Sequence, residues 1–210
     1  LTYGAPGGWA WTDLPGGMPD ADDTPGVLLA LRRLGAIDDR VQTAAARGVN
    51  WLMDLQNSDG GTPTFAKGWG KLPFDRSCPD VTAHVMWALD EWQEDLPDEL
   101  RRRVLRRQQD SLEYLADAQR KDGSWIPLWF GNQWFNNEEG PVYGTARVVD
   151  YLHQLKHVPA AAAEPLTRRG CEYLISVRNA DGGWGGTRET SSVEETALAL
   201  KALLQNAPKE

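Results

Sequence analysis

Long hydrophobic runs are missing from the sequence: no apolar stretch approaches the roughly 20 residues that a membrane-spanning helix requires. Cysteine is scarce, and two thiols, Cys78 and Cys171, are too few for a disulfide framework. Positive charge is in the minority, with 22 Lys and Arg against 30 Asp and Glu and a net charge of −8. This balance disfavours nucleic acid as a partner and strong attraction to anionic lipid head groups.

The scarcity of cysteine fits a reducing, intracellular compartment, so we expect a cytoplasmic protein. No signal peptide is recognisable, and we expect Leu1 to mark the edge of a trimmed or ordered segment. A length of 210 residues suffices for a sizeable core, and we expect a single domain over residues 1–210.

Tryptophan is abundant, with ten residues in the chain, and several of them belong to an internal repeat. Three segments align: RGVNWLMDLQNSDGGT, DSLEYLADAQRKDGSW and RGCEYLISVRNADGGW, which start at Arg47, Asp110 and Arg169. Each contains an aromatic residue, then Leu, then an Asp-Gly turn, and PGGWAW near the N-terminus resembles the end of an earlier copy. The repeat predicts a helix capped by a left-handed Gly, with a Trp folded back over the helix end.

Each copy is followed by a second predicted helix with a threonine near its start. These threonines are Thr24, Thr82, Thr145 and Thr196. Apolar residues recur after each of them with the helical period, and no comparable alternating run favours strands. The sequence therefore predicts an all-α protein with about 60 residues per helix pair. Such helix pairs can stack as an open solenoid or curl into a ring with one set of helices inside. The long linkers rich in Gly, Pro and Trp favour the ring, and we expect an α/α toroid, a partial or small α6–α6 barrel.

Three carboxylates crowd the start of the first threonine helix, in the segment PDADDT. One carboxylate suffices to cap a helix, so Asp20, Asp22 and Asp23 exceed that need. Counting back two positions from each threonine places Asp22 and Asp80 at equivalent points of neighbouring helices, with His84 one turn beyond Asp80. The repeat predicts an acid cluster beside a histidine on one rim of the ring.

The same residues are compatible with several alternative roles. The acids could form a helix cap with surplus surface charge, or a Mg²⁺ site, because closely spaced carboxylates chelate hard cations. His84 could be an ordinary core histidine. The proximity of Cys78, Asp80 and His84 in sequence also allows a zinc site.

Together these motifs resemble those of class II terpene cyclases. PDADDT resembles the DxDD motif of that family, and the Gln…Asp-Gly-Gly-Trp units resemble the QW repeats of squalene–hopene and oxidosqualene cyclases. DVTAH resembles the segment that carries the histidine partner of the acid, and GSWIPLW…VYGT resembles an aromatic-rich cavity segment. The resemblance covers nearly the whole chain and implies an α/α toroid enzyme for proton-initiated cyclisation of a polyprenoid such as squalene.

The resemblance implies roles for the acidic residues and the histidine. Asp22 corresponds to the proton donor, and Asp20 and Asp23 to its acidic environment. His84 corresponds to the hydrogen-bonding partner of the donor, and Asp80 to the residue that holds His84. Because like charges and desolvation both disfavour a carboxylate, we expect a raised pKa at Asp22.

The resemblance also implies a cavity lined by aromatic rings that face carbocation intermediates. The matching residues are Trp11, Trp129, Phe65 and Tyr143. Aromatic faces stabilise a cation by roughly 0.5–2 kcal/mol each without acting as nucleophiles.

No cofactor is implied, and Mg²⁺ enters only if the substrate carries a diphosphate. The implied partners are a hydrophobic polyprenoid and a second toroid domain or second copy of the chain, with peripheral membrane contact. The second domain and last repeat of the family have no match in these residues. The alternative is a module that binds a terpenoid or prenyl group without turnover, or a partial domain completed by another chain.

Overall fold

A computed structural model describes residues 6–68, 75–185 and 190–206 of the chain. The helices in these ranges are α1 (Asp23–Leu34), α2 (Asp39–Leu55), α3 (Pro79–Trp92), α4 (Asp98–Ala118), α5 (Pro141–His153), α6 (Ala160–Ser176) and α7 (Val193–Gln205), with short 3-10 turns at Gln93–Asp95 and Asn136–Glu138. An isolated antiparallel bridge joins Pro63 and Ser77. The all-α prediction is confirmed. None of the helices so described has the length and apolar character needed to cross a bilayer.

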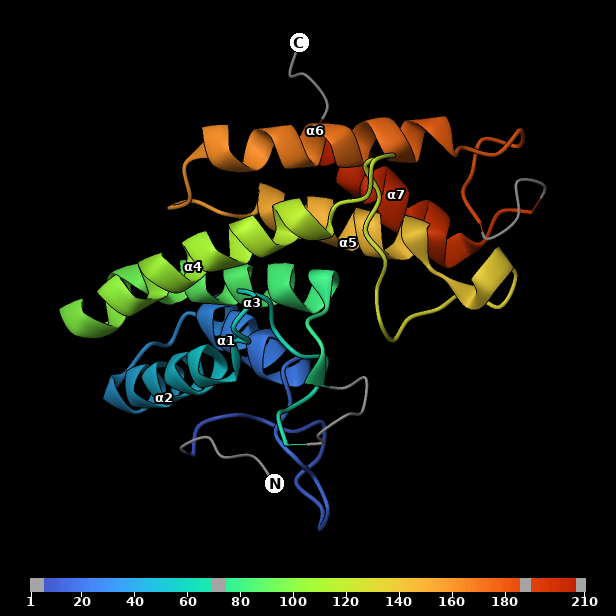
Figure 1. Cartoon of the computed structure of the whole chain (residues 1–210). Helices are drawn as coiled ribbons and strands as arrows, with labels where there is room; N and C mark the ends of the chain where they lie inside the picture. The colour runs from blue at the N-terminus through green and yellow to red at the C-terminus, as the bar shows by residue number, and fades with distance from the viewer. Residues whose placement is uncertain (1–5, 69–74, 186–189, 207–210) are drawn as a thin grey trace.

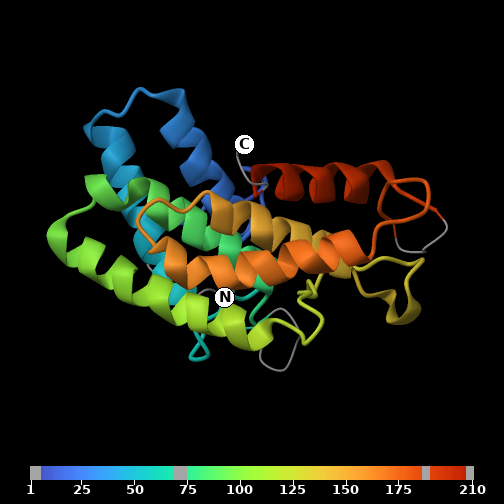
Figure 2. The same ribbon diagram turned by 90° about the horizontal axis from the view of Figure 1, so that it is seen from above.

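The helices alternate between an inner and an outer layer (Figures 1 and 2). The inner helices α1, α3, α5 and α7 pack one against the next in that order, and the outer helices α2, α4 and α6 pack on α1, α3 and α5. Figure 2 shows the blue α1 and the red α7 at the two ends of this arrangement. In the described ranges these two helices do not pack along their lengths, so the layers form an open arc. The fold is that of a partial α/α toroid, as predicted.

A glycine turn follows each outer helix, as the repeat predicts. The glycines with positive φ in these turns are Gly60 (87°), Gly123 (92°) and Gly182 (90°). The expectation that they cap the helices is wrong in detail, because α2 and α4 already end at the glutamines Gln56 and Gln119, whose backbones are non-helical. The glycines instead permit the tight turn that follows, where a side chain would be strained. The indoles of Trp125 and Trp184 then cover the helix ends, each donating its N–H to a carbonyl of the preceding outer helix, at 2.8 and 2.7 Å.

The repeated glutamine joins each turn to the next outer helix. The amide nitrogen of Gln56 donates to the carbonyl of Gly60 at 2.7 Å and to that of Arg107 in α4 at 2.9 Å. The amide nitrogen of Gln119 likewise donates to the carbonyls of Gly123 and of a residue in α6, each at 3.0 Å. The glutamine amides therefore bridge each turn to the next outer helix and fix the spacing of the outer layer.

The repeated threonine fastens each turn to an inner helix. The hydroxyls of Thr24, Thr82, Thr145 and Thr196 accept the backbone N–H groups of Trp9, Thr62, Trp125 and Trp184, respectively, at 2.9, 2.9, 3.0 and 3.0 Å. Each acceptor lies in the first turn or two of its helix. The loops are therefore gathered over the N-terminal ends of the inner helices, where the candidate acids lie.

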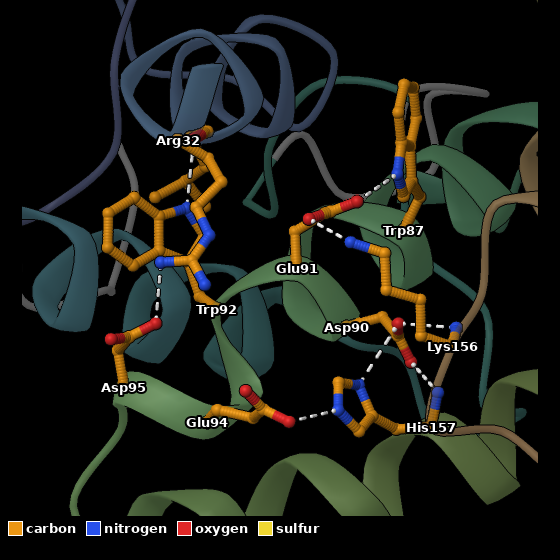
Figure 3. A network of polar contacts seen from close by, with 10 residues as sticks. Arg32, Trp87, Asp90, Glu91, Trp92, Glu94, Asp95, Lys156 and His157 are labelled. Atoms are coloured by element: carbon orange, nitrogen blue, oxygen red, sulfur yellow. Dashed lines mark hydrogen bonds and ion pairs between the residues drawn. The ribbon is translucent and has the colours of Figure 1, made fainter. Parts of the chain in front are cut away.

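A polar network ties the inner helices together at their opposite, C-terminal ends (Figure 3). The carboxylate of Asp90 in α3 is fully buried and accepts the backbone N–H groups of Lys156 and His157, which follow α5, at 2.7 and 3.1 Å. Arg32 of α1 pairs with Asp95 at 2.6 Å. These contacts hold α1, α3 and α5 in register, and so position their N-terminal ends as well.

Candidate active site

The N-terminal ends of α1 and α3 bring Asp22, Asp80 and His84 together, as the repeat register predicts. Asp22 occupies the N-cap position of α1, and Asp80 lies in the first turn of α3. Nδ1 of His84 lies 3.8 Å from Oδ1 of Asp22. At this distance the contact is too long for a hydrogen bond, and it is an ion pair only when the imidazole is protonated. Both carboxylates line a cavity of about 130 Å³.

Aromatic side chains form the other wall of this acid cavity. Phe65 and Trp129 both line it, and their rings meet edge to face with centroids 5.2 Å apart. The sequence singled out both residues. It did not single out Phe130, which also lines the cavity and whose only signal was its place beside Trp129.

A larger pocket of about 610 Å³ lies beside the acid cavity, between the loop before α5 and the start of α7. Tyr143 lines this larger pocket, together with Trp134 and Glu194, and Phe130 lines both spaces. Tyr143 is therefore placed near the acid but not in the same cavity. Trp11 is 79 % exposed and is not among the residues that line either space.

Asp20, rather than Asp22, acts as the cap of α1. Its Oδ1 accepts the backbone N–H groups of Asp22 and Asp23 at 2.9 and 2.7 Å, whereas Asp22 makes no capping hydrogen bond. Burial, followed by the adjacent Asp23 carboxyl, raises the pKa of Asp20 to about 7, although the two backbone bonds work against this rise. Helix capping thus accounts for Asp20 and leaves the Asp22 carboxylate directed at the cavity.

The pKa of Asp22 shifts in the direction opposite to the one expected from crowding. The interaction with the side chain of His84 lowers the pKa of Asp22, outweighing the effect of burial, and the charge of Arg147 in α5 adds to the lowering. The prediction of a raised pKa is wrong for Asp22 because its carboxylate is turned toward an imidazole. At Asp20, by contrast, burial and crowding prevail and the pKa is raised.

Asp80 contacts a thiol rather than the imidazole that it was expected to hold. Sγ of Cys78 donates to Oδ1 of Asp80 at 2.9 Å, and the backbone N–H of Leu128 donates to that sulfur at 3.3 Å. Asp80 is 4 % exposed, and burial raises its pKa. His84 is held by stacking on Tyr151 of α5, with centroids 4.7 Å apart and planes 9° from parallel. The motifs assigned no role to Tyr151, although it shares a helical face with Tyr143.

The Cys78 thiol is unlike a metal ligand. Burial and the neighbouring Asp80 carboxyl raise its pKa, which disfavours the thiolate form that zinc binds. Across the described ranges, His, Cys, Asp and Glu side chains form no group of three or more that could hold a metal ion.

Comparison with known proteins agrees with this geometry. The family model for the squalene–hopene cyclase C-terminal domain matches residues 3–206. The squalene–hopene cyclase of Bradyrhizobium diazoefficiens is 27 % identical over 227 residues, which cover 95 % of this chain and 32 % of that protein. The drimenyl diphosphate synthase of Streptomyces showdoensis is 32 % identical over 191 residues, which cover 88 % of this chain and 30 % of that protein.

Solved structures show the same relationship at the level of the fold. An ent-copalyl diphosphate synthase from Streptomyces platensis superposes with a TM-score of 0.69 at 25 % identity, covering 96 % of this chain and 33 % of that one. A polysaccharide lyase with 18 % identity and a TM-score of 0.64 shares the fold alone. The chain spans about a third or less of the length of the curated relatives it matches. It belongs to the family of squalene–hopene cyclase C-terminal domains and is a class II terpene cyclase-like domain.

Proposed function

We propose that this chain is the acid-bearing part of a class II terpene cyclase, in which Asp22 protonates an alkene of a polyprenoid and so starts its cyclisation. The observation that carries the proposal is the cavity in which the Asp22 carboxylate faces Phe65 and Trp129 while His84 lies 3.8 Å away. The names of the relatives, which include a squalene–hopene cyclase and two diphosphate synthases, support a polyprenoid substrate.

The acid must be strong, because an alkene is a very weak base. Protonated His84 stabilises the carboxylate that forms when Asp22 gives up its proton, and the N-terminus of α1 does the same through its dipole. We infer that the proton delivered to the alkene carbon is the carboxylic proton of Asp22, while the imidazolium of His84 keeps its own proton and stabilises the carboxylate that remains.

The pKa values of Asp20 and Asp80 shift in the direction opposite to that of Asp22. The raised pKa values of Asp20 and Asp80 keep these carboxyls protonated to higher pH than an ordinary aspartate. Negative charge on either neighbour would make Asp22 a weaker acid, so the raised pKa values of Asp20 and Asp80 favour its strength. The cluster thus combines one carboxyl whose pKa is lowered with two whose pKa values are raised, a division typical of acid–base sites.

The aromatic wall suits the cation that protonation creates. Phe65 and Trp129 lie beside the acid, and neither ring is a nucleophile that would trap the cation. The acid cavity of about 130 Å³ takes the reacting end of the chain. The adjoining pocket of about 610 Å³, which shares Phe130, is large enough to take the remainder.

The test compares three proteins: the wild-type chain, Asp22→Asn, and Asp13→Asn as a matched control at an exposed position. Each is incubated with squalene and, separately, with geranylgeranyl diphosphate, and extracts are dephosphorylated and analysed by gas chromatography. We expect cyclic product from the wild type and Asp13→Asn and none from Asp22→Asn, whose circular dichroism and melting temperature remain close to wild type. Full activity of Asp22→Asn would overturn the assignment. Binding of a polyprenoid by the wild type without any product would instead show a binding module.

A further inference from the structure

The inner face of α5 carries a cation that no described carboxylate neutralises. Tyr143, Arg147 and Tyr151 follow one another at four-residue intervals and so share this face. The Arg147 guanidinium carbon lies 4.7 Å from the ring centre of Tyr151 and 5.8 Å from that of Tyr143. No ion pair joins Arg147 to an acid in the described ranges, where its contacts are with aromatic faces.

Tyr151 connects this cation to the candidate acid. Its ring contacts Arg147 and is also stacked with the imidazole of His84, at 4.7 Å between centroids. His84 in turn lies 3.8 Å from Asp22. Tyr151 is 4 % exposed, so the ring that links the two groups is shielded from solvent. The four residues form one array that crosses from α5 through α3 to α1.

We propose that Arg147 is a positioning residue of the acid: it holds Tyr151, and through it His84, against Asp22, and its unpaired charge stabilises the Asp22 carboxylate. The expected effect of Arg147 on catalysis rests on the proposed function of the chain. The electrostatic relationship between Arg147 and Asp22 is a property of the folded chain and can be measured without substrate.

The charge of Arg147 differs from that of His84 in being permanent. A guanidinium stays protonated at any pH at which the protein is folded, whereas the imidazole is charged only when protonated. The charge of Arg147 lowers the pKa of Asp22, acting after the larger effect of His84. Arg147 therefore sustains the strength of the acid after the imidazole has lost its proton.

None of the other described groups that act on Asp22 carries a permanent positive charge. From α3 these are His84 and the buried Asp80, and from α5 they are Arg147 and the phenols of Tyr143 and Tyr151. Its own segment contributes only acids. Arg147 is thus the permanent cation among the described groups that act on Asp22.

The experiment measures the titration of Asp22 by ¹³C NMR of its carboxyl carbon. The proteins compared are the wild-type chain, Arg147→Met and Arg147→Lys, with Arg33→Met as the matched control. Arg33 lies 5.2 Å from the ring centre of Trp87, so it also rests on an aromatic face, but it is exposed and is not among the charges that act on Asp22.

We expect Arg147→Met to move the Asp22 midpoint upward by roughly 0.5–1 pH unit, because the carboxylate loses its permanent cation. Arg147→Lys keeps the charge and is expected to shift the midpoint less, and Arg33→Met is expected to leave it unchanged. An unchanged midpoint in Arg147→Met would overturn the inference. If that variant does not fold, Arg147→Gln, which also keeps the aliphatic stem, is judged by the same criterion.

Measuring product formation gives a second readout. It also distinguishes a failure of the proposed function from a failure of the role proposed for Arg147. In an active protein, Arg147→Met is expected to form product more slowly and to lose activity at a higher pH than the wild type does. A change that merely loosened the structure would lower the rate without moving the pH profile. A wild type that binds a polyprenoid without making product refutes the proposed function, whereas an unmoved Asp22 midpoint refutes the role of Arg147.

Discussion

Nδ1 of His84 in α3 lies 3.8 Å from Oδ1 of Asp22 at the N-cap of α1, so the contact spans two helices. Those helices pack directly on one another and are tied at their far ends by the network that includes Arg32 and Asp95. The strength of Asp22 as an acid therefore depends on how α1 and α3 are packed, as well as on the residues of its own motif.

Replacing His84 by Asn is expected to weaken the acid. The interaction that lowers the pKa of Asp22 is lost, so the pKa rises and the carboxylate left after proton transfer is less stable. Loss of a positioned acid–base partner of this kind lowers rates by about 10²- to 10⁴-fold. Product formation measured by gas chromatography tests the rate, and carboxyl NMR tests the pKa.

His153→Asn is the control for this experiment, because His153 is exposed in the last turn of α5. We expect that variant to match the wild type in both measurements. If His84→Asn retained wild-type activity with an unchanged Asp22 titration, the contact between Asp22 and His84 would contribute neither to the pKa of Asp22 nor to the reaction.

The buried carboxyl of Asp20 is expected to make the stability of the chain depend on pH. Its pKa is about 7 in the folded state and 3.8 in the unfolded chain, so folding takes up a proton between these values. The free energy of unfolding therefore falls as the pH rises from about 4 to about 7. Asp20→Asn keeps an oxygen that can accept the two backbone N–H groups but has no proton to lose. We expect its melting temperature to fall less than that of the wild type between pH 5 and pH 8.

A second helix cap provides the control. Asp38 accepts the backbone N–H of Val41 at 2.9 Å at the start of α2, but it is exposed. Asp38→Asn is expected to show the same pH dependence as the wild type. Equal pH dependence in Asp20→Asn and the wild type would mean that Asp20 is not protonated in the fold.

Much of this fold was predictable from the repeat, because the repeated residues form local hydrogen bonds that shape each turn. The threonine register placed Asp22 beside Asp80 and His84 correctly, since each threonine hydroxyl holds the turn over its own helix. The glycine turns and the covering indole of Trp125 followed from the same pattern.

The electrostatics of the site could not be predicted in the same way, because they depend on contacts between helices far apart in sequence. The lowered pKa of Asp22 comes from groups in α3 and α5, and the pairing of Cys78 with Asp80 competes with the role expected of Asp80. Motif spacing also provided no measure of exposure, and Trp11 lies mostly in solvent although its position in the motif suggested a cavity wall.

Replacing Gly123 by Ala is expected to destabilise the fold strongly. Gly123 has a φ of 92°, and an added Cβ would lie 2.3 Å from the carbonyl oxygen of Arg169 in α6. Backbone strain and the collision with α6 together are expected to lower the free energy of unfolding by roughly 2–4 kcal/mol, measured by urea denaturation.

Gly35→Ala separates the two contributions. Gly35, which ends α1, also has a positive φ, 73°, but an added Cβ there meets nothing within 4 Å. Strain alone is expected to cost about 1–2 kcal/mol at this position. Equal losses in the two variants would show that the contact of the turn with α6 contributes nothing.

Replacing Asp90 by Ala is expected to destabilise the C-terminal end of the inner layer. The Asp90 carboxylate has no exposed surface and accepts the N–H groups of Lys156 and His157, as well as lying 3.3 Å from Nδ1 of His157 (Figure 3). Its removal leaves these donors without their acceptor, for which we expect a loss of about 3 kcal/mol in urea denaturation.

Glu94→Ala tests whether burial gives Asp90 this importance, because Glu94 contacts the same imidazole from solvent. Its Oε1 lies 3.2 Å from Nε2 of His157, but its side chain is 77 % exposed. Water already screens such a pair and replaces it when it is broken, so its loss is expected to cost less than about 1 kcal/mol. Because both variants remove a carboxylate partner of His157, a similar loss in each would place the stabilisation in the imidazole contact. A loss confined to Asp90→Ala would place it in the two backbone N–H groups that fix the segment after α5 to α3.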